Sequence, residues 1–164
     1  MNHDWFQRIR KVLILEEGNR RFAYDDGTGK LLHASVGKLT IGIGHNLQEN
    51  GLSEAARDFI LREDVEICLF DAYKIFGQDR FDSFPEERRT AVISLLFQLG
   101  HTKFIKFTPT IALMEEGKWE EAADRLENTL WATQLRNFGS KRLGRTLTML
   151  RECRYDKDYG VEKL

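Results

Sequence analysis

The chain has 164 residues, of which 41% are hydrophobic and 11% aromatic, so it can form one domain, or two small lobes with a shared core, and its composition does not suggest disorder. A formal net charge of −1 lacks the basicity that is typical of nucleic-acid-binding proteins. No stretch approaches the ~20 apolar residues of a membrane span. The apolar run from Val12 to Leu15 is too short for a signal peptide. We therefore expect the protein to stay in the compartment where it is made.

The two cysteines lie far apart and belong to no cluster with metal-ligand spacing. Cys68 and Cys153 each fall in an apolar helical pattern, which favours buried thiols over a disulfide or a structural metal site. We expect no metal and no cofactor.

The first expected element is an amphipathic helix over residues 3–16. Its apolar positions, from Trp5 to Leu13, recur at helical spacing, and Gly18 is suited to end it. Residues 25–30, DDGTGK, are typical of a tight turn. A calcium loop is a poorer interpretation, because the segment lacks the alternating oxygen ligands and the terminal glutamate of one.

Two strands are expected next, over residues 31–36 and 39–43, with Gly37-Lys38 as the hairpin turn between them. Glycines in the second strand, TIGIGH, indicate close approach of another backbone or of a ligand. This stretch lacks the third glycine and the βαβ unit of a nucleotide-binding loop. The region thus predicts a small antiparallel sheet.

From Ser53 onward the apolar spacing becomes helical. Ser53 can cap a long helix whose apolar stripe ends near Gly77, and Pro85 suits the first position of a helix that ends at Gly100. Shorter helices are expected between Pro109 and Gly117, over residues 118–127 and over residues 140–151. The fold class is α+β, with strands and helices segregated.

Four carboxylates lie close together in LEEGNRRFAYDDG, residues 15–27. The simpler interpretation is that they are solvated residues at a helix end and a turn, and spacing alone favours it. The sharper interpretation is that Glu17 and Asp26 face each other across a cleft. Glycoside hydrolysis requires such a pair, with a protonated acid on one side of the bond and a carboxylate on the other. The basic stretch from Arg136 to Arg154 suits an anion-binding face or a solvated helix surface equally.

The order of these motifs resembles the phage-type lysozymes of glycoside hydrolase family 24. LEEG, Tyr24, Asp26 and TIGIGHN at residues 40–46 carry the first part of the resemblance. Further landmarks follow through most of the chain: Asn50-Gly51, Glu63-Asp64-Val65, Leu96 to Gly100, Phe107-Thr108, Lys118 to Ala123, Trp131, Arg142 and Arg145. The resemblance implies one lysozyme-like domain over residues 1–164. Its small β lobe would span about residues 17–60, and a long helix would join it to a helical lobe formed by residues 1–16 and 61–164.

The resemblance also implies cleavage of the β-1,4 bond between N-acetylmuramic acid and N-acetylglucosamine in peptidoglycan. It assigns Glu17 as the general acid, Asp26 as the second carboxylate and Thr40 as a residue that helps to hold the attacking water. Glu17 would lie at the negative end of a helix dipole, which favours the neutral acid, and the matched Arg142 would oppose this effect. Glycan contacts are implied at Asn46, Phe97, Gln98, Thr110 and Arg125. His45 is expected to pair with Asp64 in a structural role.

Two features depart from the family pattern. Residues 27–39 lengthen the segment between Asp26 and Thr40, and we expect them to extend the wall over the substrate, where His33 and Ser35 could touch glycan. The near-neutral charge differs from the strongly basic balance expected of a protein that meets anionic murein.

The resemblance favours a monomeric phage endolysin that waits in the host cytoplasm and reaches peptidoglycan through a holin, with no nucleic-acid partner and no direct membrane insertion. Two alternatives stay open. A lytic transglycosylase would use the glutamate without a water-holding aspartate and release a 1,6-anhydro sugar. A catalytically silent wall-binding or virion module is the other.

Overall fold

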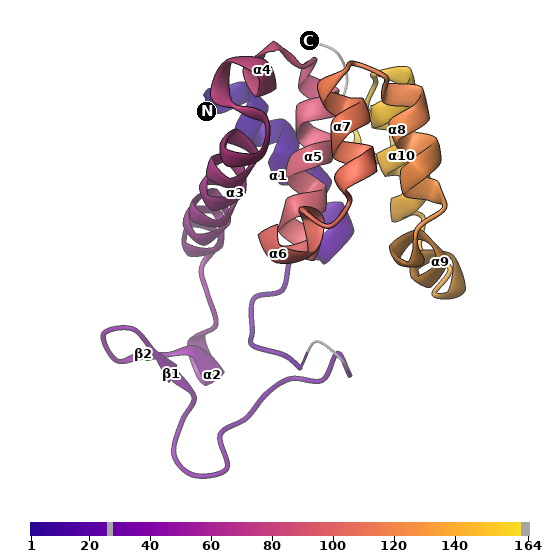
Figure 1. The fold of residues 1–164 in the computed structure, drawn as a ribbon. Helices are drawn as coiled ribbons and strands as arrows, with labels where there is room; N and C mark the ends of the chain where they lie inside the picture. Colours follow the sequence, from indigo (N-terminus) through magenta and orange to yellow (C-terminus); the bar gives the residue numbers. More distant parts are fainter. Residues whose placement is uncertain (26–27, 162–164) are drawn as a thin grey trace.

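The computed structural model describes residues 1–25 and 28–161. These residues form a mostly helical structure with one small two-stranded antiparallel sheet. Figure 1 shows most helices gathered into a bundle, while the sheet and one short helix lie apart from it, near the start of a long helix. The expected mixture of a small sheet and many helices is therefore confirmed.

The helices and strands follow one another along the chain in two groups. The N-terminal part contains α1 (His3–Glu17), β1 (Thr40–Ile41), β2 (His45–Asn46) and α2 (Leu47–Asn50). The remainder contains α3 (Glu54–Phe76), α4 (Gln78–Ser83), α5 (Glu86–Leu99), α6 (His101–Phe104), α7 (Thr108–Glu115), α8 (Trp119–Glu127), α9 (Leu130–Asn137), α10 (Arg142–Glu152) and the 3-10 turn η1 (Lys157–Tyr159).

The longer helices match the sequence predictions closely. The Ser53 hydroxyl accepts a hydrogen bond of 3.1 Å from the backbone N–H of Ala56 and so caps α3, as expected. Gly18 ends α1 with φ +86, and its N–H donates to the carbonyl of Ile14. The short helices α2, α4, α6 and α9 were not predicted, because one or two turns show too little periodicity to be recognised.

The predicted hairpin was wrong in register. Thr40 and Ile41 pair with Asn46 and His45, so the chain reverses at residues 42–44 and not at Gly37-Lys38. Gly42 and Gly44 both have positive φ, which allows this tighter reversal. Residues 31–36 form no strand and make only an isolated bridge between Leu31 and Tyr24. Since the side chain of Gln48 accepts the N–H groups of Ala34 and Leu39, this segment is fixed by side-chain contacts in place of a ladder.

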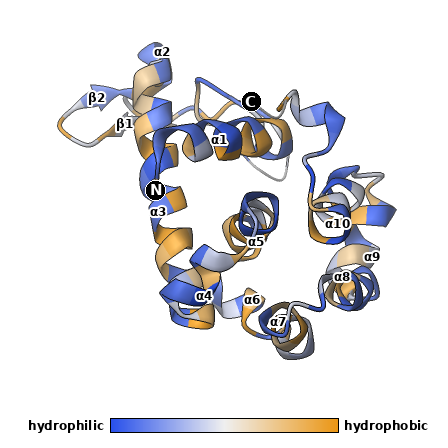
Figure 2. Cartoon of the chain, turned by 90° about the horizontal axis from the view of Figure 1, so that it is seen from above, coloured by the Kyte–Doolittle hydropathy of each residue, from blue (hydrophilic) through white to orange (hydrophobic). Residues whose placement is uncertain are grey.

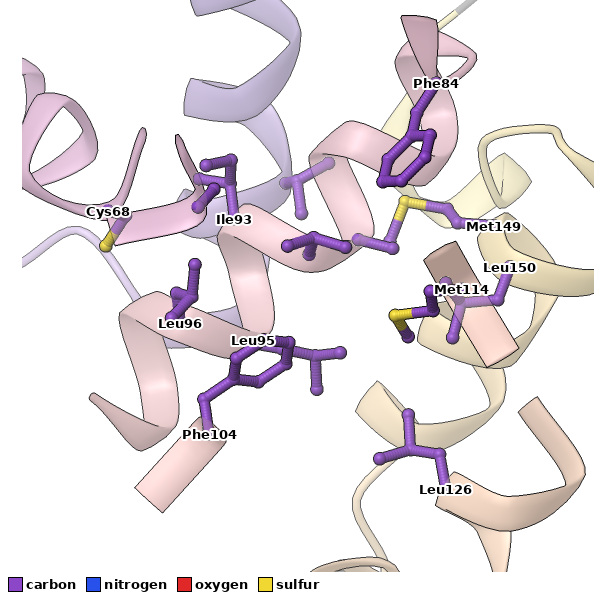
Figure 3. Close-up of a cluster of buried hydrophobic side chains, with 14 of the residues drawn as sticks. Cys68, Phe84, Ile93, Leu95, Leu96, Phe104, Met114, Leu126, Met149 and Leu150 are labelled. Carbon is purple, nitrogen blue, oxygen red and sulfur yellow. The ribbon is translucent and has the colours of Figure 1, made fainter. Parts of the chain in front are cut away.

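Helix α5 lies at the centre of the bundle, surrounded by other helices when viewed from above (Figure 2). Every residue from Thr90 to Leu96 is buried, as is typical of a helix that is covered on all sides. Figure 3 shows Leu95 and Leu96 of α5 close to side chains from several helices, including Phe104, Met114 and Leu126. Packing around α5 therefore holds the bundle together.

The cysteine prediction was half right. Cys68 is buried on α3, facing α5. Cys153 is only half-buried, because it ends α10 with φ +50 and lies at the margin of the bundle core. Among the described residues, no helix has both the length and the apolar character needed to cross a bilayer.

Candidate active site

Two adjacent glutamates at the end of α1 meet two arginines of α10. Glu16 has a side chain only 2% exposed, and it accepts hydrogen bonds from Arg142 Nε at 2.9 Å and from Arg145 Nε at 2.7 Å. Arg145 Nη2 donates a further bond of 3.1 Å, and the Tyr159 hydroxyl donates one of 2.8 Å. Glu16 is therefore a buried carboxylate whose two oxygens are both occupied.

These contacts decide the charge of Glu16. Burial raises the pKa of its carboxyl, but the hydrogen bonds from Arg145, Arg142 and Tyr159 outweigh burial, and the pKa lies below its ordinary value. Burial, together with the same carboxylate, raises the pKa of the Tyr159 hydroxyl. Glu16 is thus ionised at neutral pH and serves as the anchor for both arginines.

Arg142 connects this anchor to Glu17. While its Nε donates to Glu16, its Nη2 donates to Glu17 Oε1 at 2.7 Å. The arginine side chain is 7% exposed, whereas that of Glu17 is 38% exposed. Within residues 1–25 and 28–161, Glu17 Oε2 has no hydrogen-bond partner. One oxygen of Glu17 is therefore fixed from behind and the other is open.

Glu17 borders a hollow of about 320 Å³. The hollow lies where the end of α1, the first half of α3 and the end of α5 converge, and it has both polar and apolar walls. Its lining residues are Leu13, Ile14, Glu17, Gly18, Asn19, Arg20, Tyr24, Leu52, Arg57, Asp58, Ile60, Leu61, Asp64 and Phe97. A fixed carboxyl group beside an aromatic ring and further polar groups is suited to bind a sugar and transfer a proton to it.

The other two expected catalytic residues belong to the segment between α1 and α3. Asp26 lies outside the described residues. Thr40 begins β1, is exposed, and donates a hydrogen bond from its hydroxyl to the carbonyl of Lys38 at 3.1 Å. The structure thus brings Glu17, Phe97 and Asp64 to one hollow and places Thr40 on the sheet.

The expected pairing of His45 with Asp64 is not formed. His45 Nε2 lies 2.8 Å from the carbonyl oxygen of Gly51, in its own segment, and Asp64 lines the hollow from α3. The reason is local: α2 and Gly51 follow β2 directly, so the nearest acceptor for the imidazole is a backbone carbonyl. His45 therefore fixes the chain between the sheet and α3.

The remaining glycan-contact residues are spread over the molecule. Asn46 caps α2 by accepting the Glu49 N–H at 3.1 Å, and Gln98 Oε1 accepts from Trp131 Nε1 at 3.1 Å. Thr110 is only 4% exposed. Arg125 lines a separate hollow between α7 and α8. Their assignment as glycan contacts stays a prediction.

Sequence reasoning named Arg142 as a neighbour of Glu17 but missed the rest of the support behind it. Arg145 lies three residues after Arg142 on the same basic helix, so a pair of arginines facing a pair of glutamates was a readable signal. Tyr159 follows an irregular segment, and no local pattern connects it to Glu16. Arg57 lines the hollow and donates to the carbonyl of Leu52 at 2.7 Å, but reads in the sequence as an ordinary exposed helix residue.

A carboxyl group that is held at a helix end beside a hollow is suited to acid-catalysed bond cleavage. Comparison with known proteins gives the class. Residues 15–152 match the family model described as phage lysozyme. The chain belongs to the phage lysozyme family and is therefore a glycoside hydrolase.

Two curated relatives come from Dictyostelium discoideum. The protein named probable T4-type lysozyme 2 is 25% identical over 153 residues, which cover 77% of this chain and 85% of the relative. The protein named probable T4-type lysozyme 1 is 26% identical over 156 residues, with coverage of 81% and 89%. The similarity thus extends over most of the chain.

Proposed function

We propose that this chain hydrolyses the β-1,4 bond between N-acetylmuramic acid and N-acetylglucosamine in peptidoglycan, with inversion at the anomeric carbon and Glu17 as the general acid. The observation that carries the proposal is the state of Glu17. Its Oε1 is held by the buried Arg142, its Oε2 has no partner among the described residues, and Glu17 lines a hollow of about 320 Å³. A general acid must point at the leaving oxygen, and a carboxyl that is fixed from one side is positioned for this task.

The second half of the mechanism requires a water molecule on the opposite face of the sugar. We assign its activation to Asp26 and its orientation to Thr40, as the resemblance of the sequence motifs implies. The Thr40 hydroxyl donates to the Lys38 carbonyl, so its oxygen lone pairs can accept a hydrogen bond from the water. Inversion needs carboxyl groups roughly 6.5–9.5 Å apart. Because Glu17 and Asp26 belong to different parts of the sequence, we propose this wider spacing.

Substrate contacts are proposed first at Phe97, whose ring shares the hollow with Glu17. Arg125 would contact a more distant part of the glycan in the hollow between α7 and α8. Asn46, Gln98 and Thr110 remain weaker assignments, because each side chain already has a local partner or is buried.

The division into two lobes remains a proposal. Residues 17–60 would form the small lobe, and residues 1–16 and 61–164 the helical lobe. It is supported by α3, which begins next to the sheet and runs along the bundle (Figure 1). We also propose an endolysin role in which the enzyme acts from the host cytoplasm after a holin opens the membrane. Expression in a bacterial host with and without a co-expressed holin tests this role, since lysis without the holin would contradict it.

The central experiment replaces Glu17 with Gln. This substitution preserves size but removes the titrating proton, and general acid catalysis contributes roughly 10²–10⁴-fold. Clearing of a peptidoglycan suspension should therefore slow at least 100-fold. A matched control is Glu54→Gln, in an exposed ion pair with Arg10. Near-normal clearing by a folded Glu17→Gln protein would refute the assignment.

The product distinguishes the rival enzyme. Inverting hydrolysis releases a reducing N-acetylmuramic acid that is initially the α-anomer. NMR of a fresh digest would show a 1,6-anhydro sugar if the protein were a lytic transglycosylase, and an initial β-anomer if Asp26 were a covalent nucleophile. A wall-binding module would bind peptidoglycan and release no sugar at all.

A further inference from the structure

Arg20 links the end of α1 to a turn further along the chain. It follows Glu17 by three residues, and its Nη1 donates a hydrogen bond of 3.0 Å to the carbonyl of Gly29. The central carbon of its guanidinium lies 4.4 Å from the centre of the Tyr24 ring. Both Arg20 and Tyr24 line the hollow that Glu17 borders. One side chain therefore contacts the hollow and the turn together.

The turn that Arg20 contacts is closed by its own hydrogen bonds. The N–H of Asp25 donates to the carbonyl of Lys30 at 2.8 Å, and the N–H of Gly29 donates to the carbonyl of Asp25 at 2.7 Å. The carboxylate of Asp25 accepts a bond of 2.7 Å from the N–H of Thr28. We call these four residues, Asp25, Thr28, Gly29 and Lys30, the Asp25 turn. Bonds between its side chains and its own backbone give the turn a defined shape.

The Asp25 turn lies at the tip of a short ladder. Tyr24 and Leu31 form an antiparallel bridge, and the N–H of Leu32 donates to the carbonyl of Ala23 at 3.0 Å. Figure 1 shows the chain between α1 and β1 extending away from the helical bundle. The ladder does not attach the turn to α1, so the position of the turn relative to Glu17 depends on contacts such as those of Arg20.

An arginine is suited to such a link. The face of its planar guanidinium can stack on an aromatic ring while the N–H groups at its edge donate hydrogen bonds. Arg20 uses the face on Tyr24 and the edge on Gly29. Because the group is rigid, the two contacts together restrain both the position and the orientation of the turn.

The neighbouring Arg21 makes a similar pair of contacts to a different segment. Its guanidinium carbon lies 5.4 Å from the centre of the Phe22 ring, and its Nε and Nη2 donate to the carbonyl of Asn50 at 3.0 Å and 2.8 Å. It therefore holds the end of α2, and it is not among the residues that line the hollow. Arg21 is thus a natural control for Arg20.

We propose that Arg20 is a positioning residue for the hydrolysis, because it holds the turn that leads into Asp26 at a fixed separation from Glu17. This inference rests on the proposed function, in which Glu17 protonates the leaving oxygen and Asp26 activates the water. Asp26 follows Asp25 directly in the sequence. Two groups that act on opposite faces of one sugar must keep their spacing, and a displacement of about 1 Å can slow a reaction roughly 100-fold.

Steady-state kinetics on soluble peptidoglycan strands tests this role. Arg20→Gln removes the stacking and shortens the donor, so kcat should fall about tenfold or more while KM changes less than about twofold. Arg21→Gln should leave kcat within about twofold of wild type. Unchanged kcat in Arg20→Gln, or an equal loss in both variants, overturns the proposal. Far-UV circular dichroism and melting temperatures verify that both variants are folded.

A double-mutant cycle shows whether Arg20 acts through Asp26. In an Asp26→Asn background, Arg20→Gln should lower kcat by less than about twofold further, since the group that it positions is already disabled. Effects that multiply would indicate a merely structural role and overturn the proposal. So would an Asp26→Asn protein with the kcat of wild type.

Hydrogen exchange tests the contact without any assay of activity. The amides of Thr28 and Gly29, followed by NMR, should exchange about threefold faster or more in Arg20→Gln and at the wild-type rate in Arg21→Gln. Equal exchange rates in the two variants contradict the link between Arg20 and the turn. A wild-type protein that releases no sugar from peptidoglycan would instead contradict the proposed function, which separates the two failures.

Discussion

Replacing Glu16 with Gln tests whether the buried carboxylate holds the catalytic end of α1 in place. The substitution keeps the shape of the side chain and removes its charge. Arg142 and Arg145, whose side chains are 7% and 12% exposed, then lose their shared counter-charge. Removing one partner of a buried ion pair costs about 3–5 kcal/mol of unfolding free energy.

The geometry points to the lower end of that range. Arg142 keeps its hydrogen bond to Glu17, and Arg145 keeps Asp158 at 3.4 Å, so neither guanidinium is left without a carboxylate. We expect a loss of about 3 kcal/mol. For a chain of this size, that corresponds to a melting temperature about 6–12 °C lower.

Urea denaturation at pH 7, followed by circular dichroism, measures this loss. The control is Glu54→Gln, because the Glu54 side chain is 70% exposed and its pair with Arg10 should contribute at most about 1 kcal/mol. If Glu16→Gln costs no more than this control, the buried network does not stabilise the end of α1, and the explanation given for the position of Glu17 fails.

The structure supports three further predictions. The pKa of Glu16 lies below its ordinary value of 4.5, so its stabilising contribution should be complete above pH 4.5 and lost as the pH falls through the folded-state pKa. The difference in unfolding free energy between wild type and Glu16→Gln, measured by urea denaturation, should therefore shrink below pH 4.5. A difference that grows would contradict the assignment. Gly51 has φ +61, and a Cβ there would lie 2.6 Å from Arg21 Cγ and 2.7 Å from the Arg21 carbonyl oxygen, so Gly51→Ala should cost about 2–3 kcal/mol of unfolding free energy. The control is Gly139→Ala, which has φ +65 and open space around it and should cost only about 1–2 kcal/mol. Equal melting temperatures for the two variants would show that the close contact is unimportant. Burial raises the pKa of the Cys68 thiol to about 12, so the thiol should not react at about pH 8 while the protein is folded. Mass spectrometry after treatment with a thiol reagent should find Cys68 unmodified in the native protein and modified after unfolding. Equal modification of Cys68 and Cys153 in the native state would refute the burial of Cys68.

Helix positions could be predicted well because their signals are local. Ser53 before α3, Gly18 after α1 and the apolar spacing within each of these helices act over a few residues, so the sequence is sufficient to locate the ends of the longer helices. The sheet failed for the opposite reason. Residues 31–36 alternate as a strand should, but strand pairing depends on a partner elsewhere, and the glycines at 42 and 44 placed the reversal later in the chain.

The order of the motifs along the chain indicated the family, helix periodicity located the longer helices, and the family resemblance singled out Glu17 as the predicted general acid. Only the tertiary structure decided how Arg142 is itself held behind Glu17, through the buried Glu16. Arg142 is 125 residues away in the sequence, and Tyr159, which supports Glu16, is 143 residues away. Contacts of that range arise when α10 and η1 pack beside the end of α1, and no local preference encodes which carboxylate becomes the buried anchor and which remains open to the hollow.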